Sequence, residues 1–454
     1  MAGDELSAAY LDLVRRNGHK PSELLGPVAA EAKELDAFAS GRFMPCPLFL
    51  TAQEKTRLTE DLVNLRTALV SLPDRLFGGD LAAFARAVGM TDTQIDMASR
   101  GRGPEVTRFA RADLLAVPGG FQVVEFNMGS TVGGVDIAEL ARVMLEHPTL
   151  AAFAAEHALE YTDTRVEALH TLFAETGVAR EGDPFIAIVD SPGSFPSLEK
   201  YLHSAAETWG ERYGIRADAC HLGELEYDDG SVWLRGQRVD AVWRVFMLEN
   251  LVSRPHEAAV MAPLMDAAER GEIQIFTPLD AEVFGSKNAL AMVADQANRH
   301  LFNTGEQASL DRLLPWTRIL TEGEGTLDDG EKVDLVEYAL NNRTGLVLKP
   351  TLMHGGIGVV LGTDPHVTQE YWEEQVRQGL DGAHIIQRLV PPAPDYFPTE
   401  DGDIEPYSVM WGTFTTARGY GGTYGRAVAD ATSTTGVISL ANGSRAAAAL
   451  HATG

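Results

Sequence analysis

The sequence predicts an α/β protein with several sheets, and three observations lead to this fold class. Apolar residues recur at helical spacing in the first hundred residues, short apolar runs alternate with helical stretches between 185 and 285, and the last part is rich in strand-forming runs and glycine. With 454 residues, 45% of them hydrophobic, the chain can bury a sizeable core. We expect about three domain-sized units, or one large multi-lobed protein.

The first region, residues 1–107, has the pattern of a mainly helical segment. Thr51 and Glu54 have the spacing of a capping box, in which each side chain bonds the backbone N–H group of the other residue. This motif precedes a helical face of leucines, at positions 58, 62, 65, 69 and 72. We interpret that face as core packing.

The second region, residues 108–285, opens with two short apolar runs separated by Pro118-Gly119-Gly120, the pattern of a β-hairpin. Strands and helices then alternate, which predicts an α/β unit with some parallel sheet. The loop SPGSFPS (191–197) lies at a strand-to-helix junction and fits an anion site and a plain turn equally well. The expected elements are strands at 185–190, 241–246 and 273–276, a helix at about 198–209, and a hairpin turn at 228–230.

The third region, residues 286–454, combines further strands with glycine-rich segments. The acidic stretch TEGEGTLDDGE (321–331) is predicted to be a surface loop, and the alanine-rich end from Ala446 a frayed helix or tail. Strands are expected at 346–350 and 383–390, followed by a Gly/Thr-rich β region to about residue 440.

Charge and composition exclude several classes of function. The formal net charge of −28 argues against binding of nucleic acid or of anionic membranes, although a local site can still attract ATP. Two cysteines, Cys46 and Cys220, cannot form a disulfide framework or a cysteine-rich zinc site. The acidic start of the chain differs from a signal peptide, and no apolar run reaches 18 residues. We expect a cytoplasmic protein. The sequence is compatible with a monomer and with a homo-oligomer.

Several widespread catalytic motifs do not occur in the sequence. It contains no G-x-x-x-x-G-K-[ST], no G-x-G-x-x-G after a strand, no G-x-S-x-G and no H-E-x-x-H. Their absence weakens the hypotheses of a P-loop NTPase, a dinucleotide-dependent oxidoreductase, a serine hydrolase and a zinc protease.

The predicted hairpin carries polar residues at alternate positions. Glu125 and Asn127 are two apart on one strand and therefore face the same side, and Arg111 and Asp113 have the same relation on the preceding strand. Carboxylate and amide oxygens brought together in this way suit Mg²⁺. A solvent-exposed sheet face is the alternative interpretation, because Glu-x-Asn alone occurs often by chance.

A second candidate site follows the strand LVLKP. Lys349 ends an apolar strand, where an ammonium is costly to bury unless it meets an anion. Gly355, Gly356 and Gly358 follow in a flexible loop whose N–H groups can cover phosphates. A lysine pointing to solvent before a turn is the alternative; the adjacent glycines favour phosphate binding.

Three further segments carry weaker signals. Lys287 lies at the expected start of a helix, where it could share an anion with the helix N-terminus or be an ordinary surface lysine. Arg426, in a glycine-lined strand, could clamp a phosphoryl group or form a structural ion pair. The strand that could border an adenine, or be an ordinary core strand, ends in Gln387, Arg388, Leu389 and Val390.

Taken together, the ordered motifs resemble the glutathionylspermidine synthase family of ATP-grasp ligases. The match spans about residues 108–430 and lies in order and spacing, since no single motif is specific. The Glu-x-Asn motif precedes the lysines, as in this circularly permuted branch of the fold. The motifs are Arg-x-Asp, Glu-x-Asn, the arginine strand DAVWRVF, SKNAL, LKPTLMHGGIG, IIQRLV and GTYGR.

The resemblance implies a circularly permuted ATP-grasp fold with a preceding α/β domain, and a role for each matched residue. Asp113, Glu125 and Asn127 would hold Mg²⁺, with two ions expected. Lys287, Lys349 and the glycine loop would contact ATP phosphates, and residues 387–390 would border the adenine. Arg111 and Arg426 would stabilise the charged acyl-phosphate and tetrahedral states.

Four departures from the family pattern are present, and the first concerns the substrate. The family's metal motif usually continues as Glu-x-Asn-x-Asp-x-Pro, whereas this chain reads EFNMGSTVGG, which argues against glutathione. Met353 and His354 replace a usual Arg-Glu pair, and Ala427 stands where the family tends to have Glu. A separate amidase domain is absent from the sequence, so hydrolysis of the product is not expected.

The expected activity is that of an ATP-dependent carboxylate–amine ligase that forms an acyl-phosphate and releases ADP and phosphate. The acid would be an amino acid or peptide, and the acidic chain favours a cationic amine such as a polyamine or basic amino acid. Carrier-protein or peptide substrates are also compatible with the sequence. The alternatives are an ATP-grasp phosphotransferase with a stable phosphorylated product and a nucleotide-binding protein without turnover.

Overall fold

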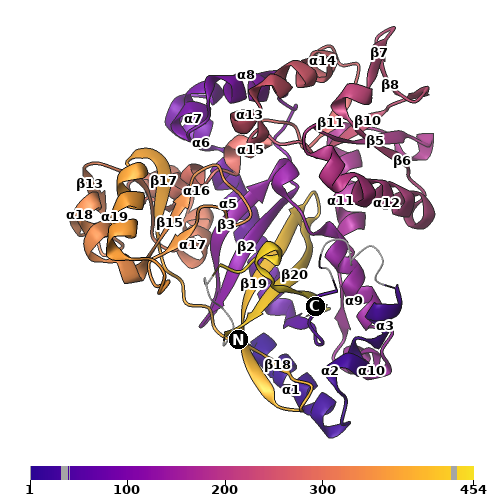
Figure 1. The fold of residues 1–454 in the computed structure, drawn as a ribbon, viewed down its shortest axis with the longest axis vertical. Helices are drawn as coiled ribbons and strands as arrows, with labels where there is room; N and C mark the ends of the chain where they lie inside the picture. Colours follow the sequence, from indigo (N-terminus) through magenta and orange to yellow (C-terminus); the bar gives the residue numbers. More distant parts are fainter. Residues whose placement is uncertain (1, 32–38, 40, 431–436, 454) are drawn as a thin grey trace.

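The computed structural model describes residues 2–31, 39, 41–430 and 437–453, and these residues form three lobes, of which the first is built on one large sheet (Figure 1). The large sheet has eight strands in the order β1-β21-β20-β19-β2-β3, with β18 beside β19 and β4 beside β21. Its strands come from distant parts of the chain: β1 (Leu48–Leu50), β2 (Ala110–Val117), β3 (Gly120–Met128), β4 (Leu159–Glu160), β18 (Asp395–Pro398), β19 (Ile404–Thr416), β20 (Gly419–Ala429) and β21 (Arg445–Ala452).

The expected hairpin is present as β2 and β3, which pair antiparallel, with Arg111 opposite Asn127 and Asp113 opposite Glu125. The register shifts between Asp113 and Leu114, so β3 carries one extra residue at this point. β19 pairs with β2 on the outer side of the hairpin and joins it to the C-terminal strands. Residues 431–436 of the expected Gly/Thr-rich β region lie outside the described residues.

The prediction of a helix or tail from Ala446 is wrong, because these residues form β21. This strand pairs antiparallel with β20 and parallel with β1, and Ala446 to Ala449 are buried. Alanine has the highest intrinsic helix propensity, but pairing on both sides and burial override that weak preference. The small side chains suit a crowded position, since a Cβ on the neighbouring Gly425 would lie 2.5 Å from Leu48 Cδ1.

Residues 1–107 are mainly helical, as expected, and some of these helices pack against the large sheet. Thr51 caps α5 and forms the predicted capping box with Glu54, and Leu58, Leu62 and Leu65 of α5 are buried. The helices before β5 are α1 (Ala2–Arg16), α2 (Pro21–Leu24), α3 (Gly26–Glu31), α5 (Ala52–Val70), α6 (Leu72–Phe77), α7 (Leu81–Ala87), α8 (Asp92–Arg100), α9 (Ala138–Met144), α10 (Pro148–Glu156) and α11 (Thr164–Thr176).

A four-stranded parallel sheet forms the second lobe, as the alternation of strands and helices predicted, in the order β11-β10-β5-β6. The turn at 228–230 joins β7 to β8 in the expected small hairpin. The strands are β5 (Phe185–Asp190), β6 (Arg216–His221), β7 (Glu226–Asp228), β8 (Ser231–Leu234), β9 (Gln237–Arg238), β10 (Ala241–Arg244) and β11 (Gln274–Phe276); the helices are α12 (Phe195–Tyr213), α13 (Asn250–Ser253), α14 (Ala258–Glu269) and α15 (Ala281–Phe284).

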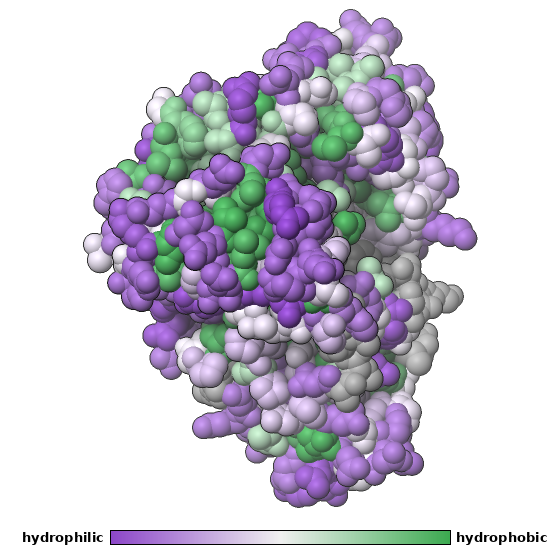
Figure 2. Space-filling view, turned by 60° about the vertical axis from the view of Figure 1, so that its left-hand side comes forward, coloured by the Kyte–Doolittle hydropathy of each residue, from purple (hydrophilic) through white to green (hydrophobic). Residues whose placement is uncertain are grey.

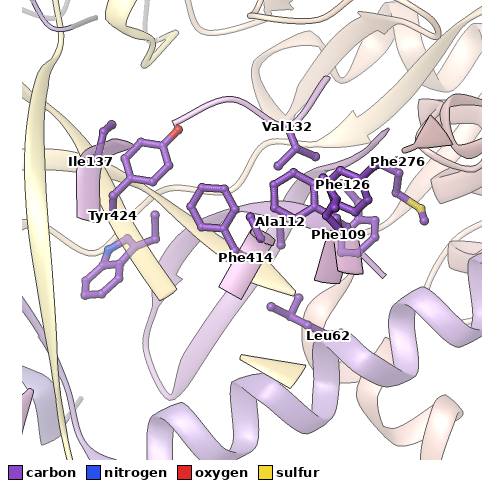
Figure 3. Packing of buried hydrophobic residues seen from close by; sticks show 14 of the residues in the cluster. Leu62, Phe109, Ala112, Phe126, Val132, Ile137, Phe276, Phe414 and Tyr424 are labelled. Carbon is purple, nitrogen blue, oxygen red and sulfur yellow. The ribbon is translucent and has the colours of Figure 1, made fainter. Parts of the chain in front are cut away.

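Aromatic rings join the parallel sheet to the large sheet. The ring of Phe109 lies 5.6 Å from Phe276 and 5.9 Å from Trp243, and on the other side 6.4 Å from Phe414. Figure 3 shows Phe109, Phe276 and Phe414 in this cluster, together with Leu62 of α5. Both sheets therefore share one hydrophobic core.

The third lobe has its own smaller core, built on the antiparallel sheet β12-β17-β15-β16. The acidic stretch 321–331, predicted as a loop, instead contributes β13 to a short exposed hairpin with β14. The elements of this lobe are β12 (Thr317–Thr321), β13 (Glu324–Thr326), β14 (Lys332–Asp334), β15 (Leu346–Pro350), β16 (Val360–Leu361), β17 (Asp381–Arg388), α18 (Leu335–Asn341) and α19 (Gln369–Gln378). Two helices connect it to the main core: α16 (Lys287–Ala294) contacts β12 and β17 as well as α5 and β3, and α17 (Thr304–Leu313) packs on α5 and β3.

The face on which the third lobe lies forward is mostly hydrophilic, with small groups of hydrophobic side chains between the polar ones (Figure 2). Among the helices of residues 2–31, 39, 41–430 and 437–453, none has the length and apolar character needed to cross a membrane.

Candidate functional site

A cavity of about 480 Å³ lies where the large sheet meets the third lobe. Its walls come from β2, β3 and β20 on one side and from β15 and β17 on the other. Among the candidate site residues, Lys287 and Gly358 do not line it. The candidates that do are Arg111, Asp113, Glu125, Asn127, Lys349, Gly355, Gly356, Gln387, Arg388, Leu389, Val390 and Arg426.

On the large sheet, Asp113 lies between two arginines. Arg111 Nε and Nη2 donate to Asp113 Oδ1 and Oδ2 at 2.8 and 3.3 Å, and Arg426 Nη2 lies 2.7 Å from Oδ1. Burial alone would raise the pKa of Asp113, but the two guanidiniums hold it below its ordinary value. Glycine at 412 leaves room for this cluster, since a Cβ there would lie 2.7 Å from Tyr424 Cε1 and 3.2 Å from Arg111 Cδ.

Glu125 is the point at which three segments meet. Its Oε1 accepts from Lys287 Nζ at 3.0 Å and lies 3.3 Å from His354 Nδ1. Burial would raise the pKa of Glu125, but Lys287 and His354 outweigh it and lower the pKa well below its ordinary value. Lys287 Nζ also donates to Met353 O at 2.6 Å, so this lysine ties the start of α16 to the glycine loop.

Lys349, on β15, reaches across to the large sheet without pairing with a carboxylate. Its Nζ donates to Val124 O at 2.9 Å and to Gln387 Oε1 at 2.7 Å. Burial lowers the pKa of Lys349 to about 8. Within the part of the chain that the structure describes, no acidic group lies at salt-bridge distance from this ammonium, which leaves its charge directed at the cavity.

The glycine loop contributes Gly355 and Gly356 to the lining of the cavity. Gly355, Gly356 and Gly358 have φ of 70°, 83° and 72°, a left-handed conformation that other residues rarely adopt. A Cβ on Gly356 would lie 2.7 Å from Val437 Cγ1, so the loop approaches the segment before β21 closely. Ile357, between the glycines, is 62% exposed. Gly355 and Gly356 therefore add little side-chain bulk to the cavity wall.

The apolar part of the cavity lies around the end of β17. Leu389 and Val390 follow β17 and lie in the cavity wall near Val347 of β15. Arg388 turns outward and forms an exposed ion pair with Asp328. This part has the shape and apolar lining of a small-molecule site, which combines apolar walls with a few placed polar groups.

The contacts of the three candidate Mg²⁺ ligands differ in how much of each side chain is free for an ion. Asp113 is paired with its two arginines. Among the residues described, Glu125 Oε2 forms no hydrogen bond, and the buried Nδ2 of Asn127 has no hydrogen-bond partner. Because amide nitrogen and oxygen exchange places by a flip, Asn127 can turn an oxygen toward an ion beside Glu125. Within the described part of the chain, no cluster of three or more His, Cys, Asp or Glu could hold a metal. Glu125 and Asn127 nevertheless fit Mg²⁺, which takes one or two protein ligands together with phosphates.

Three residues of the site were not identified as candidates from the sequence. The ring of Tyr424 lies beside both arginines, with its centroid 5.8 Å from Arg111 Cζ and 5.7 Å from Arg426 Cζ. Its position two residues before Arg426, on the same face of the strand, was the available signal in the sequence. His354 links Glu125 to Glu249, whose Oε2 lies 3.9 Å from His354 Nε2. No local pattern marks Glu249, because it follows β10 in a different lobe.

The loop SPGSFPS, which fitted an anion site and a plain turn equally well, uses its donors internally. Gly193 N donates to Glu257 Oε1 at 3.1 Å, and Ser191 N and Ser194 Oγ donate to Asp190 Oδ1 at 2.7 and 2.8 Å. These carboxylates occupy the groups that would hold an anion, which favours the interpretation as a turn.

Comparison with known proteins gives structural similarity at low sequence identity. The chain is similar to a glutathione synthetase-like effector from Globodera pallida in its apo form, with a TM-score of 0.54, 14% identity, and coverage of 93% of this chain and 97% of that one. This likeness shows a shared fold.

Two further solved structures are more distant. A γ-glutamylcysteine synthetase candidate from Methylobacillus flagellatus KT gives a TM-score of 0.38 at 13% identity, covering 87% of this chain and 88% of that one. The D-cycloserine synthetase DcsG gives a TM-score of 0.24 at 17% identity, covering 45% of this chain and 59% of that one. No family model matches the sequence, and no curated protein matches it significantly.

Proposed function

We propose that this chain is an ATP-dependent ligase of the ATP-grasp type that joins a carboxylate to an amine through an acyl-phosphate. The fold shared with a glutathione synthetase-like protein supports the general class. The order of the motifs, with Glu125 and Asn127 before Lys287 and Lys349, supports the circularly permuted branch.

The observation that carries the proposal is the state of Lys349. Lys349 as a whole residue is 7% exposed and lines the cavity, and its ammonium bonds only neutral acceptors. A buried cation is costly unless a negative partner compensates it, and a phosphate chain in the cavity provides that partner. Gly355 and Gly356 of the glycine loop line the same cavity, and their N–H groups would add to the attraction for phosphate.

In the first step, a carboxylate oxygen of the substrate attacks the γ-phosphorus of ATP, the bond to the β-phosphate oxygen breaks, and ADP leaves. Lys349 and the loop N–H groups hold the phosphates in position, and Arg111 and Arg426 offset the negative charge that gathers on the transferred group. Glu125 and Asn127 would hold Mg²⁺, which neutralises phosphate charge when bound. The glycine loop would exclude water from the acyl-phosphate.

In the second step, the amine nitrogen attacks the acyl carbon, phosphate leaves with the former carboxylate oxygen, and the amine loses a proton. The two guanidiniums beside Asp113 would stabilise the tetrahedral oxyanion. We propose an amino acid or peptide as the acid, and a cationic amine such as a polyamine or basic amino acid, which the −28 charge would attract.

Product analysis tests the proposal. The purified protein is incubated with ATP, Mg²⁺ and pooled amino acids, peptides and polyamines, and products are identified by mass spectrometry. A ligase releases ADP only when an amine is present. Its product has the mass of the acid plus the amine minus the mass of one water. A stable phosphorylated product without amine dependence would identify a phosphotransferase, and tight ATP binding without ADP across the whole panel would identify a non-catalytic protein.

A further inference from the structure

Gln387 is held between two other buried side chains in a way that fixes the orientation of its amide. Gln387 Nε2 donates to Thr317 Oγ1 at 3.0 Å, and Thr317 Oγ1 donates its own proton to Pro315 O at 2.8 Å. Because this hydroxyl proton is already used, Thr317 can only accept from Gln387. The amide oxygen must therefore point the other way, where it accepts from Lys349 Nζ at 2.7 Å.

The second acceptor of Lys349 comes from the other sheet and depends on the irregularity in β3. Leu114 lies opposite Val123, while Asp113 lies opposite Glu125, so Val124 has no partner in the ladder. A bulge of this kind redirects backbone groups, and the carbonyl of Val124 accepts from Lys349 Nζ at 2.9 Å. Lys349 is thus bound once by its own sheet and once by the large sheet.

Both acceptors are neutral, which distinguishes Lys349 from Lys287. The ammonium of Lys287 is paired with the Glu125 carboxylate, whereas Lys349 has two of its three donors on an amide and a carbonyl oxygen. Gln387 is 1% exposed and Thr317 fully buried, so solvent does not compete for these bonds. A carboxylate at 387 could make the same contact but would cancel the charge.

We propose that Gln387, oriented by Thr317, is a positioning residue for Lys349: it fixes the ammonium at the cavity wall and, being neutral, leaves the positive charge for a triphosphate. The inference rests on the proposed function and changes the role expected for Gln387. Its side chain acts on the phosphates through Lys349, instead of bordering the adenine.

The test compares two ligands that share the triphosphate and differ in the base: inorganic tripolyphosphate and a non-hydrolysable ATP analogue, both with Mg²⁺, titrated calorimetrically. Gln387→Glu should weaken both by about tenfold or more, since a buried carboxylate neutralises Lys349. Gln387→Met removes one anchor but keeps the charge, so it should weaken both by a smaller and similar factor. Gln378→Glu, on the exposed end of α19, adds the same charge to the same lobe and should leave both affinities unchanged.

Thermal unfolding shows which variants fold. If Gln387→Glu does not fold, the affinities of Gln387→Met decide the test. An equal loss of affinity for the two ligands supports the inference. Loss confined to the ATP analogue would place Gln387 at the base and overturn it, as would unchanged affinity for tripolyphosphate in every folded variant. Failure of the unaltered protein to bind either ligand would instead remove the proposed function, and the inference with it.

Discussion

Lys287 Nζ and Glu125 Oε1 lie 3.0 Å apart although the two residues are separated by 162 positions in the chain. Lys287 is the first residue of α16, and its ammonium crosses from the third lobe to β3 of the large sheet. The pair is buried, with side-chain exposures of 3% and 15%. It joins the two walls of the cavity at the carboxylate that we propose as a magnesium ligand.

Replacing Glu125 by Gln should reduce amine-dependent ADP release by about 10²–10³-fold, the order found for loss of one charge-stabilising group. Gln has nearly the same shape, so the fold should persist, although Lys287 loses its partner. ADP release is measured by a coupled assay and folding by circular dichroism. Glu156→Gln, on the exposed end of α10, is the matched control. Near-normal turnover by folded Glu125→Gln would contradict the assignment of the site.

Arg426→Lys should lower kcat by about 100-fold while leaving the protein folded. Lysine keeps the positive charge but lacks the planar fork that can bind Asp113 and a transferred phosphoryl group at once. Steady-state kinetics with saturating ATP and amine measures the effect. Arg418→Lys, in the turn between β19 and β20, should behave as the unaltered protein. A change in KM alone would mean that Arg426 binds substrate without acting on the chemical step.

The Arg244–Glu282 pair should be essential for stability. Arg244 is fully buried, pairs with Glu282, and donates to Thr277 O and Phe246 O at 2.5 and 2.6 Å. Arg244→Met leaves a buried carboxylate without its partner and should lower the free energy of unfolding by about 3–5 kcal/mol. Urea unfolding is the measurement, with the exposed Arg270→Met as the control. A loss no greater than that of the control would show that the pair is not needed for stability.

Asp280 should make the protein less stable as pH rises. Burial raises the pKa of Asp280 to about 7 from an ordinary value of 3.8, so the folded state favours the protonated carboxyl. Between pH 4 and 7 the unfolded chain ionises first, and the free energy of unfolding falls by up to about 4 kcal/mol from this group. Above about pH 7, the pKa of Asp280 in the folded state, this group causes no further loss of stability.

Asp280→Asn removes this ionisation, so the variant should gain stability relative to the unaltered protein between pH 4 and 8. Urea unfolding at several pH values measures the difference. Asp401→Asn, in an exposed turn, should show no such pH-dependent difference. Parallel pH profiles for Asp280→Asn and the unaltered protein would refute the prediction.

Much of the cavity wall could be predicted because its geometry is local. Alternation in β2 and β3 places Arg111 with Asp113 and Glu125 with Asn127, and the Pro-Gly-Gly turn predicts that the two strands pair. The buried strand of Lys349 and the glycines after it were visible for the same reason. Each of these relations involves residues fewer than twenty positions apart.

Other features could not be predicted from local patterns. The alanine-rich end has the composition of a helix, and only its neighbours β1 and β20 make it a strand. The extra residue at Val124 leaves no clear signal in the sequence, yet it supplies an acceptor to Lys349. His354 and Glu249 come from different lobes and meet at 3.9 Å.

By itself the sequence determined the fold class, the strand faces and the types of charged residue available, because side-chain periodicity and turn chemistry act over a few residues. Only the tertiary structure decided which of these charges meet: Lys287 with Glu125, Arg426 with Asp113, and Lys349 with two neutral oxygens. The physical reason is that ion pairing and burial depend on distance in space, which is set when the separate sheets pack against one another.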